Sequence, residues 1–178
     1  MTIFKRSLRA AALVSLCVAC TPSLNWREVR FEDGGLVVFL PCKPDKAKRE
    51  ITLQHEGQAV PAQLSMQGCE AADIQFTLSQ LTIPSSMDAK QVMAAWRVAS
   101  LHAAGAQAQE ASVQNETVGG AQAAVVALRS QIQNAQHKAQ WLWFGEGRFI
   151  YQLAVYGAPQ NKSLDEVAHV YFSGVKLP

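Results

Sequence analysis

Short stretches of alternating apolar and polar residues, separated by tight-turn signals, fill most of this chain and constrain its fold. In 73–82 (DIQFTLSQLT), Ile74, Phe76 and Leu78 recur at every second position and share a face with Gln80. A period of two is typical of a β-strand. Strand-like stretches are also expected at 26–31, 36–40, 49–54, 59–67, 110–118, 123–133 and 139–157. Because most are joined by short turns, they are expected to pair antiparallel.

Glycine-rich turns mark two of these connections. Asp33-Gly34-Gly35 precedes the continuous apolar run 36–40 (LVVFL), and Gly145-Glu146-Gly147 lies at the tip of a hairpin within 139–157. Glycine tolerates the positive φ values that tight hairpin turns require. Proline cannot donate to a strand ladder, so Pro61 predicts that its strand lies near an edge or a bulge there.

A first helix is predicted at 87–104. A cap signal at 85–88 (SSMD) precedes it and Gly105 provides a stop. The expected buried stripe consists of Val92, Trp96, Ala99 and Ala103.

A second helix is predicted at 163–172 (SLDEVAHVYF). Ser163 and Glu166 have the spacing of a capping box. Its apolar face would comprise Leu164, Val167, Ala168, Tyr171 and Phe172, and residues 174–177 (GVKL) are expected to form a short last strand.

These elements predict an α+β class, with two helices packed on a mostly antiparallel sheet. The strand segment GGLVVFLPCKP, the middle helix after SSMDAKQVMAAW, the late hairpin and the closing helix together resemble the PsbP-like fold. That resemblance implies a layered sandwich over most of 26–178 and an accessory or binding role, and it transfers no site residues.

The first twenty residues have the composition of an export signal. A basic start with Lys5, Arg6 and Arg9 leads into an apolar run from Ala10 to Ala19. The run is shorter than the roughly 20 residues that a membrane-spanning helix needs. The expected organisation is a signal peptide at 1–19, a lipidated tether at 20–25 and a single domain at 26–178.

Val18-Ala19-Cys20 resembles the lipobox of bacterial lipoproteins, although Cys17 stands where Leu is usual. The resemblance implies that Cys20 carries the lipid, palmitate included, and anchors the chain to a membrane of the cell envelope. Thr21, a residue other than Asp, favours the periplasmic side of the outer membrane over the inner one. The alternative is an ordinary secretory signal cut near Ala19, with Cys20 as a plain thiol.

Cys42 and Cys69 remain once Cys17 and Cys20 are assigned to export and anchoring. An even pair in an oxidising compartment predicts a structural disulfide. A redox or metal pair is the alternative, but the two cysteines lack the close C-x-x-C spacing that such sites use.

Charge and motifs exclude several functions. Without its first nine residues the chain carries 13 basic and 14 acidic residues, so it has no electrostatic footprint for nucleic acid. Phosphate-binding glycine loops, a nucleophile elbow and paired metal-binding histidines are missing from the sequence. No cofactor, metal or catalytic residue is therefore predicted. The four histidines (His55, His102, His137 and His169) are expected to be solvated.

The aromatic residues of 139–157 are the most suggestive feature. Trp141 and Trp143 fall on one strand face and Phe144 on the other. If both faces of the sheet are covered, the two indoles belong to the core. If one face is open, they form a binding surface for a sugar, a peptide or the membrane interface.

Two functional hypotheses follow. The first is an anchored, non-catalytic binding or accessory module, held to the membrane by its lipid and contacting an envelope protein partner; it predicts an exposed apolar or aromatic patch. The second is an envelope hydrolase or small-ligand carrier, which predicts a pocket with converging polar groups.

Overall fold

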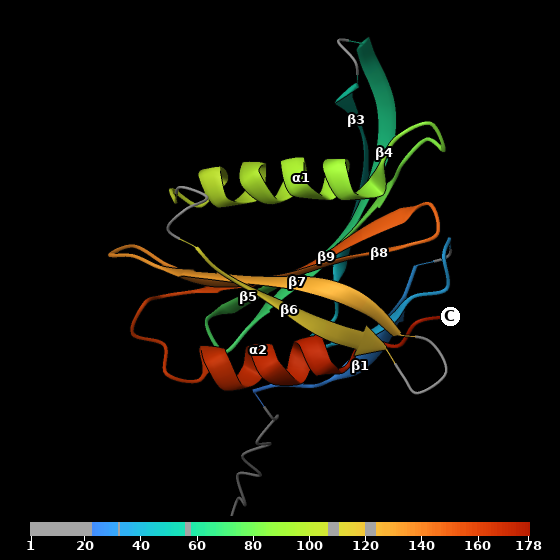
Figure 1. The fold of residues 1–178 in the computed structure, drawn as a ribbon. Helices are drawn as coiled ribbons and strands as arrows, with labels where there is room; N and C mark the ends of the chain where they lie inside the picture. Colours follow the sequence, from blue (N-terminus) through green and yellow to red (C-terminus); the bar gives the residue numbers. More distant parts are fainter. Residues whose placement is uncertain (1–22, 32, 56–57, 107–110, 120–123) are drawn as a thin grey trace, which may run out of the picture.

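A computed structural model describes residues 23–178 except 32, 56–57, 107–110 and 120–123, and it has an α+β fold (Figure 1). The described residues form nine strands and two helices. These are β1 (Arg27–Arg30), β2 (Val37–Leu40), β3 (Asp45–His55), β4 (Gln58–Ala71), β5 (Ile74–Thr82), α1 (Ala89–Ala103), β6 (Ser112–Gly119), β7 (Ala124–Gln133), β8 (Lys138–Glu146), β9 (Phe149–Gly157) and α2 (Leu164–Ser173). The predicted fold class is thereby confirmed, and the narrower PsbP-like resemblance stays a prediction.

Strands β3 to β9 form one seven-stranded sheet in the order β3-β4-β5-β9-β8-β7-β6, and β1 and β2 form a separate pair. Every pairing is antiparallel. At the centre, β5 pairs with β9, so that Leu78 lies opposite Leu153. The sheet therefore joins strands that precede α1 in the sequence (β3 to β5) to strands that follow it (β6 to β9).

The sheet is covered on both sides (Figure 1). On one side, here called the α1 face, Trp141 and Trp143 pack with Leu101 of α1. On the other, the α2 face, Leu142 and Phe144 share a core with α2 and with the β1–β2 pair. The result is a three-layer arrangement in which adjacent residues of the central strands enter different cores.

Several strand predictions are confirmed in detail. Ile74, Phe76 and Leu78 are fully buried on the α2 face, and Gln80 is buried beside them. The late hairpin is also confirmed, but its predicted tip is displaced: Gly145 and Glu146 belong to β8, Glu146 pairs with Phe149, and the turn consists of Gly147 and Arg148. The turn before β2 is also as expected, since Gly34 has a φ of +87°.

The β3–β4 hairpin is longer than the alternation predicted, with 11 and 14 residues in its two strands. β4 pairs with β5 only from Gln63 onward, so the segment of β4 before Gln63 has β3 as its neighbour. Pro61 lies in that segment, as expected for a residue with no N–H to donate. The hairpin rises past the N-terminal end of α1 (Figure 1).

The predicted stripe of α1 is partly wrong. Val92 is buried and Trp96 half-buried, but Ala99 and Ala103 are exposed. The helix instead turns Ser100 and Leu101 to the sheet: Ser100 Oγ accepts a hydrogen bond from Gln152 Nε2 at 2.8 Å, and Leu101 is fully buried. The hydrogen bond with Gln152 thus places the polar Ser100 on the sheet-facing side of the helix. A helix face predicted from apolar residues alone does not include it.

The predicted capping box of α2 is wrong. Ser163 occupies the N-cap position, but its side chain makes no capping bond. Its hydroxyl donates to Asn161 Oδ1 at 2.8 Å, and Asn161 Oδ1 also accepts the Ser163 N–H at 3.1 Å. The Ser163 hydroxyl thus bonds to the Asn161 side chain and not to a backbone N–H of the first helical turn. The predicted apolar face of α2 is confirmed.

The end of the chain pairs less than expected. Within 174–177 only Lys176 joins a ladder, as an isolated bridge to Val37. Two backbone hydrogen bonds of 3.0 and 2.9 Å hold that bridge. The predicted last strand is therefore a single contact that ties the C-terminal segment to β2.

Candidate functional site

Cys20, the predicted lipidation site, lies outside the described residues, as does the proposed signal peptide. The helices that the structure describes include none long and apolar enough to cross a membrane. The first described residues lie on the α2 face, where Leu24 and Trp26 pack against the core. The chain therefore enters the domain from that side.

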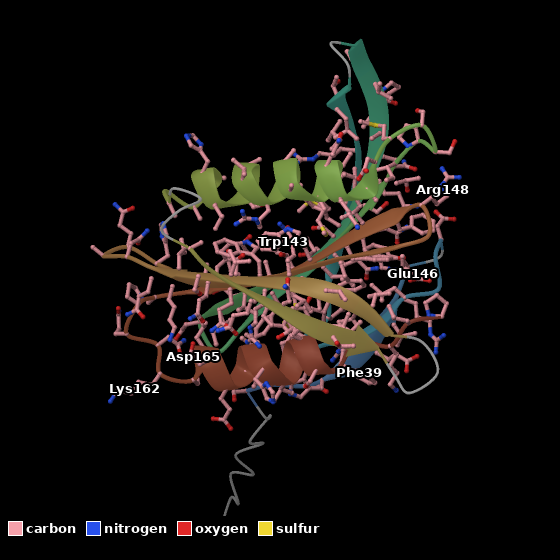
Figure 2. The ribbon with its side chains drawn as sticks, in the orientation of Figure 1. Phe39, Trp143, Glu146, Arg148, Lys162 and Asp165 are labelled. Carbon is pink, nitrogen blue, oxygen red and sulfur yellow. A yellow bond between two sulfur atoms is a disulfide. The ribbon has the colours of Figure 1, made fainter. Side chains whose placement is uncertain are left out.

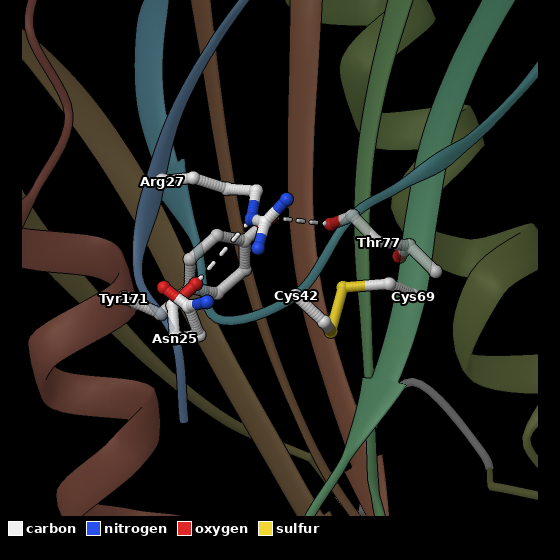
Figure 3. Close-up of a disulfide and its surroundings, with 6 residues drawn as sticks. All are labelled: Asn25, Arg27, Cys42, Cys69, Thr77 and Tyr171. Carbon is white, nitrogen blue, oxygen red and sulfur yellow. Dashed lines mark hydrogen bonds between the residues drawn. A yellow bond between two sulfur atoms is a disulfide. The ribbon is translucent and has the colours of Figure 1, made fainter. Parts of the chain in front are cut away.

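Cys42 and Cys69 form the predicted disulfide, with their Cα atoms 5.9 Å apart. Cys42 follows β2 and Cys69 lies on β4, so the bond joins the two-stranded pair to the main sheet (Figure 3). Nearby, Tyr171 of α2 donates from its hydroxyl to the carbonyl of Thr77 at 2.9 Å. The disulfide thus strengthens the packing of the α2 face and belongs to the scaffold.

Trp141 and Trp143 are both fully buried, so the core alternative holds for them. Their rings stack with centroids 5.9 Å apart, and the Trp141 indole donates to the Tyr156 hydroxyl at 2.9 Å. Figure 2 shows Trp143 between α1 and the sheet. Neither side chain offers a surface to a partner, because α1 covers this face.

The histidines are dispersed. His102 and His169 are exposed, His137 is partly buried, and the side chain of His55 lies outside the described part. Among the residues that the structure describes, no three His, Cys, Asp or Glu side chains gather to hold a metal ion.

An apolar hollow lies between α1 and the edge of the sheet, with a volume of about 520 Å³. We call it the α1–β3 cleft. Its lining comes from β3, from β5, and from α1 with the residues just before it: Ile51, Thr52, Leu53, Leu81, Met87, Asp88, Gln91, Val92, Ala95, Trp96 and Ala99. Its size falls within the range of roughly 300–1,000 Å³ that is usual for ligand sites.

Local structure explains how these side chains meet. Ile51 and Leu53 alternate along β3 and pack, half-buried, against the core that also contains Leu81. Opposite them, Asp88 starts α1 by accepting hydrogen bonds from the N–H groups of Lys90 and Gln91, at 2.7 and 3.1 Å. Val92 and Trp96, one turn apart, then face the strand.

The chemistry of the cleft is that of apolar contact. Asp88 is the one charged residue among the described residues of the lining, and both of its hydrogen bonds are made to backbone N–H groups at the start of α1. Trp96 supplies a large half-buried ring, and the small side chains of Ala95, beside it in the sequence, and Ala99, about one turn later, leave space next to that ring. Such a site can hold an apolar side chain or chain end, and the described residues that line it include no nucleophile with an adjacent base.

A second cavity, of about 600 Å³, lies near the C-terminal end of α1. We call it the Tyr156 cavity; its lining includes Glu70, Asp73, Gln75, Ser100, Gln136, His137 and Tyr156. Burial raises the pKa of Tyr156, and hydrogen bonds with Trp141 and Thr77 partly oppose this rise. The phenol is therefore neutral near pH 7 and occupied by structural contacts.

A polar hollow of about 500 Å³ beside α2 is bordered by an internally satisfied network. Arg129 contacts Glu116 at 3.4 Å and donates to Gln140 at 2.8 Å. Gln140 in turn donates to Asp165 at 2.6 Å, and Lys138 pairs with the same carboxylate. These charges join strands β6 to β8 to the start of α2, and so have a structural role.

None of the family models, curated proteins or solved structures compared with this chain matches it. The site must therefore be argued from its own geometry. Sequence patterns had placed Val92 and Trp96 on one helix face, but the contribution of β3 was missed. A tryptophan at 96 with alanines at 95 and 99 was the available signal in the sequence.

Proposed function

We propose that this chain is a membrane-anchored, non-catalytic binding module of the bacterial cell envelope, which holds an envelope partner in the α1–β3 cleft. The cleft is the observation that carries the proposal. It combines an apolar lining with the ring of Trp96, and aromatic residues in sheltered hollows contribute strongly to recognition. The hypothesis of a binding module predicts an exposed apolar or aromatic patch, and the cleft is an apolar site whose residues Ile51, Leu53 and Trp96 are partly exposed.

The proposed anchor agrees with the position of the cleft. A lipid on Cys20 would hold the α2 face, where Leu24 and Trp26 pack, toward the membrane. α1, which lines the α1–β3 cleft, lies on the opposite side of the sheet from α2 (Figure 1). A partner in the periplasm would then reach the cleft without competing with lipid. The disulfide Cys42–Cys69 fits an oxidising compartment of this kind.

A hydrolase or small-ligand carrier is the second candidate, and the Tyr156 cavity is the observation that favours it. Glu70, Asp73 and His137 bring polar groups to that cavity. We rank it second because Glu70 and Asp73 are exposed at the cavity rim, whereas catalytic carboxylates usually lie in sheltered surroundings.

Site-specific photo-crosslinking in intact cells tests the choice between the two sites. A photoreactive residue replaces Gln91 in the cleft, Gln136 in the Tyr156 cavity, or Val98, which is 48% exposed on α1 outside the cleft lining. We expect a discrete adduct from position 91 and none from position 98. Adducts from 136 alone would favour the carrier, and equal labelling from 91 and 98 would contradict the proposal.

Metabolic labelling tests the anchor separately. Wild-type protein and a Cys17→Ser variant should both incorporate labelled palmitate, because lipidation is assigned to Cys20. A Cys20→Ser variant should lose the label and the membrane association with it. Continued labelling of Cys20→Ser would refute the anchor and leave the cleft untouched.

A further inference from the structure

β3 is the outer strand of the sheet and pairs along its whole length with β4, from Asp45 opposite Gly68 to His55 opposite Gln58. In the part of the chain that the structure describes, no strand pairs with its other side. An outer strand keeps a row of N–H and C=O groups without ladder partners. Such a row can bind the backbone of another extended segment.

Charge divides β3 into two halves. Residues 45–50 (DKAKRE) carry five charges, whereas 51–54 (ITLQ) carry none. Charged side chains, lysine above all, protect outer strands from unwanted pairing. The unprotected half supplies Ile51, Thr52 and Leu53 to the α1–β3 cleft. The open strand edge and the apolar hollow therefore coincide.

The partner of Thr52 sets the direction of its backbone groups. Thr52 lies opposite Pro61, which has no N–H and cannot complete the two-bond exchange of a hydrogen-bonded antiparallel pair. Thr52 is accordingly a non-hydrogen-bonded position, at which the N–H and C=O point away from β4. They are presented to the free edge beside the cleft.

From these three observations we infer that the partner is an extended peptide segment, which pairs with β3 at Ile51–Leu53 and places a large apolar side chain in the α1–β3 cleft. Backbone pairing supplies affinity in strand addition, and pockets for alternate side chains supply specificity. Because side chains of a strand alternate between faces, every second residue of the peptide would face α1 and Trp96. The inference rests on the proposed function and specifies its partner.

Trp96 provides the readout, since it is the tryptophan that lines the cleft. The acylated full-length protein in lipid nanodiscs is titrated with the peptide acetyl-KTVTFTVTK-amide while tryptophan emission is followed. We expect a saturable shift that is absent from a Trp96→Phe variant. Replacing the central Phe of the peptide with Ala should weaken binding by about tenfold or more, the effect of losing one buried aromatic side chain.

Two proline variants test the strand pairing. Thr52→Pro removes the outward N–H beside the cleft and should weaken binding by about fivefold or more, as expected for a lost backbone hydrogen bond. Lys48→Pro removes another N–H that points away from β4, four residues from Thr52 and outside the cleft lining. It should alter the affinity for the peptide less than about twofold. Far-UV circular dichroism checks that both fold. If Thr52→Pro does not fold, the wild-type protein is tested instead with a peptide N-methylated at the residues whose N–H groups would point to β3. This peptide should also bind at least about fivefold more weakly than the unmodified one.

Other occupants give distinct results. The inference would be overturned if the two proline variants bound the peptide with equal affinity and the N-methylated peptide bound as tightly as the unmodified one. If laurate shifts Trp96 emission and the peptide does not, the inference would also be overturned, and the cleft would be a site for acyl chains, as a small-ligand carrier would have. A dimer abolished by Thr52→Pro would assign the edge to a second copy of the chain. Failure of both probes, together with no crosslink from position 91, would remove the proposed function as well.

Discussion

At the scale of single residues, alternation along a strand predicts which face of the sheet a side chain lies on, but not whether that face is buried or exposed. The pattern at 141–144 placed both indoles opposite Phe144, as the structure has them. Whether Trp141 and Trp143 were buried depended on α1, which ends almost forty residues earlier. Their burial could not be predicted from the hairpin itself, because it is a property of tertiary packing.

Tyr151 predicts a stability change at high pH. Burial, and to a lesser extent the carboxylate of Glu146, raise its pKa from 10.0 to about 12. Between these values the folded state keeps a proton that the unfolded chain has lost, so the stability contribution is full below pH 10 and declines as pH rises toward 12. The decline amounts to roughly 2–3 kcal/mol for this group.

Tyr151→Phe should remove that share of the decline. Its hydroxyl has no hydrogen-bond partner among the described residues, so the variant should match the wild type near pH 8. Urea unfolding at pH 8, 10 and 11 measures the difference. A residual slope remains, since burial also raises the pKa of Tyr156 and Tyr171. Identical slopes in both proteins would show that Tyr151 titrates normally.

At the scale of elements, the strands could be predicted because apolar residues recur at every second position in the sequence. The buried face of α1 was harder to predict. Gln152 is buried in the sheet beneath α1 and donates to Ser100, so one polar pair occupies a position expected to be apolar. The α1–β3 cleft was out of reach for another reason. It requires the length and path of the β3–β4 hairpin, which turns and strand alternation alone do not determine.

The start of α1 offers a test at this scale, because Asp88 caps the helix and lines the cleft. Asp88→Ala removes the acceptor of two backbone N–H groups and should lower the free energy of unfolding by about 1 kcal/mol. Asp88→Asn keeps an acceptor and should lose no more than a few tenths. Urea denaturation of both variants decides; an equal loss would indicate that the charge matters and the cap does not.

At the scale of the whole molecule, the disulfide joins the two sheets over a separation of 27 residues. In the chain-entropy account, closing such a loop stabilises by about 3–4 kcal/mol. Reduction, or the double change Cys42→Ser and Cys69→Ser, should therefore cost about that much in guanidinium unfolding. The reductant should not affect the double variant. A loss below about 1 kcal/mol would mean that the packing of β1 and β2 holds without the bond.

The three layers also separate the proposed roles. The α2 face contains the disulfide, the charged network and the entry of the chain, whereas the cleft, with the uncharged residues of β3 that line it, lies on the α1 face. In the proposed orientation one face is held toward the membrane and the other is presented to a partner. Export and anchoring were inferred from the sequence alone; the site required the fold.

Filling the cleft tests the central claim most directly. Ala99→Trp places a ring in the cleft lining, and Val98→Trp places the same ring on α1 outside it. The measurement is the yield of the crosslinked adduct from position 91 in each background. A reduction of about tenfold with Ala99→Trp, corresponding to about 1.4 kcal/mol of lost binding, and an unchanged yield with Val98→Trp are predicted. Equal yields in the two backgrounds would contradict binding in the α1–β3 cleft.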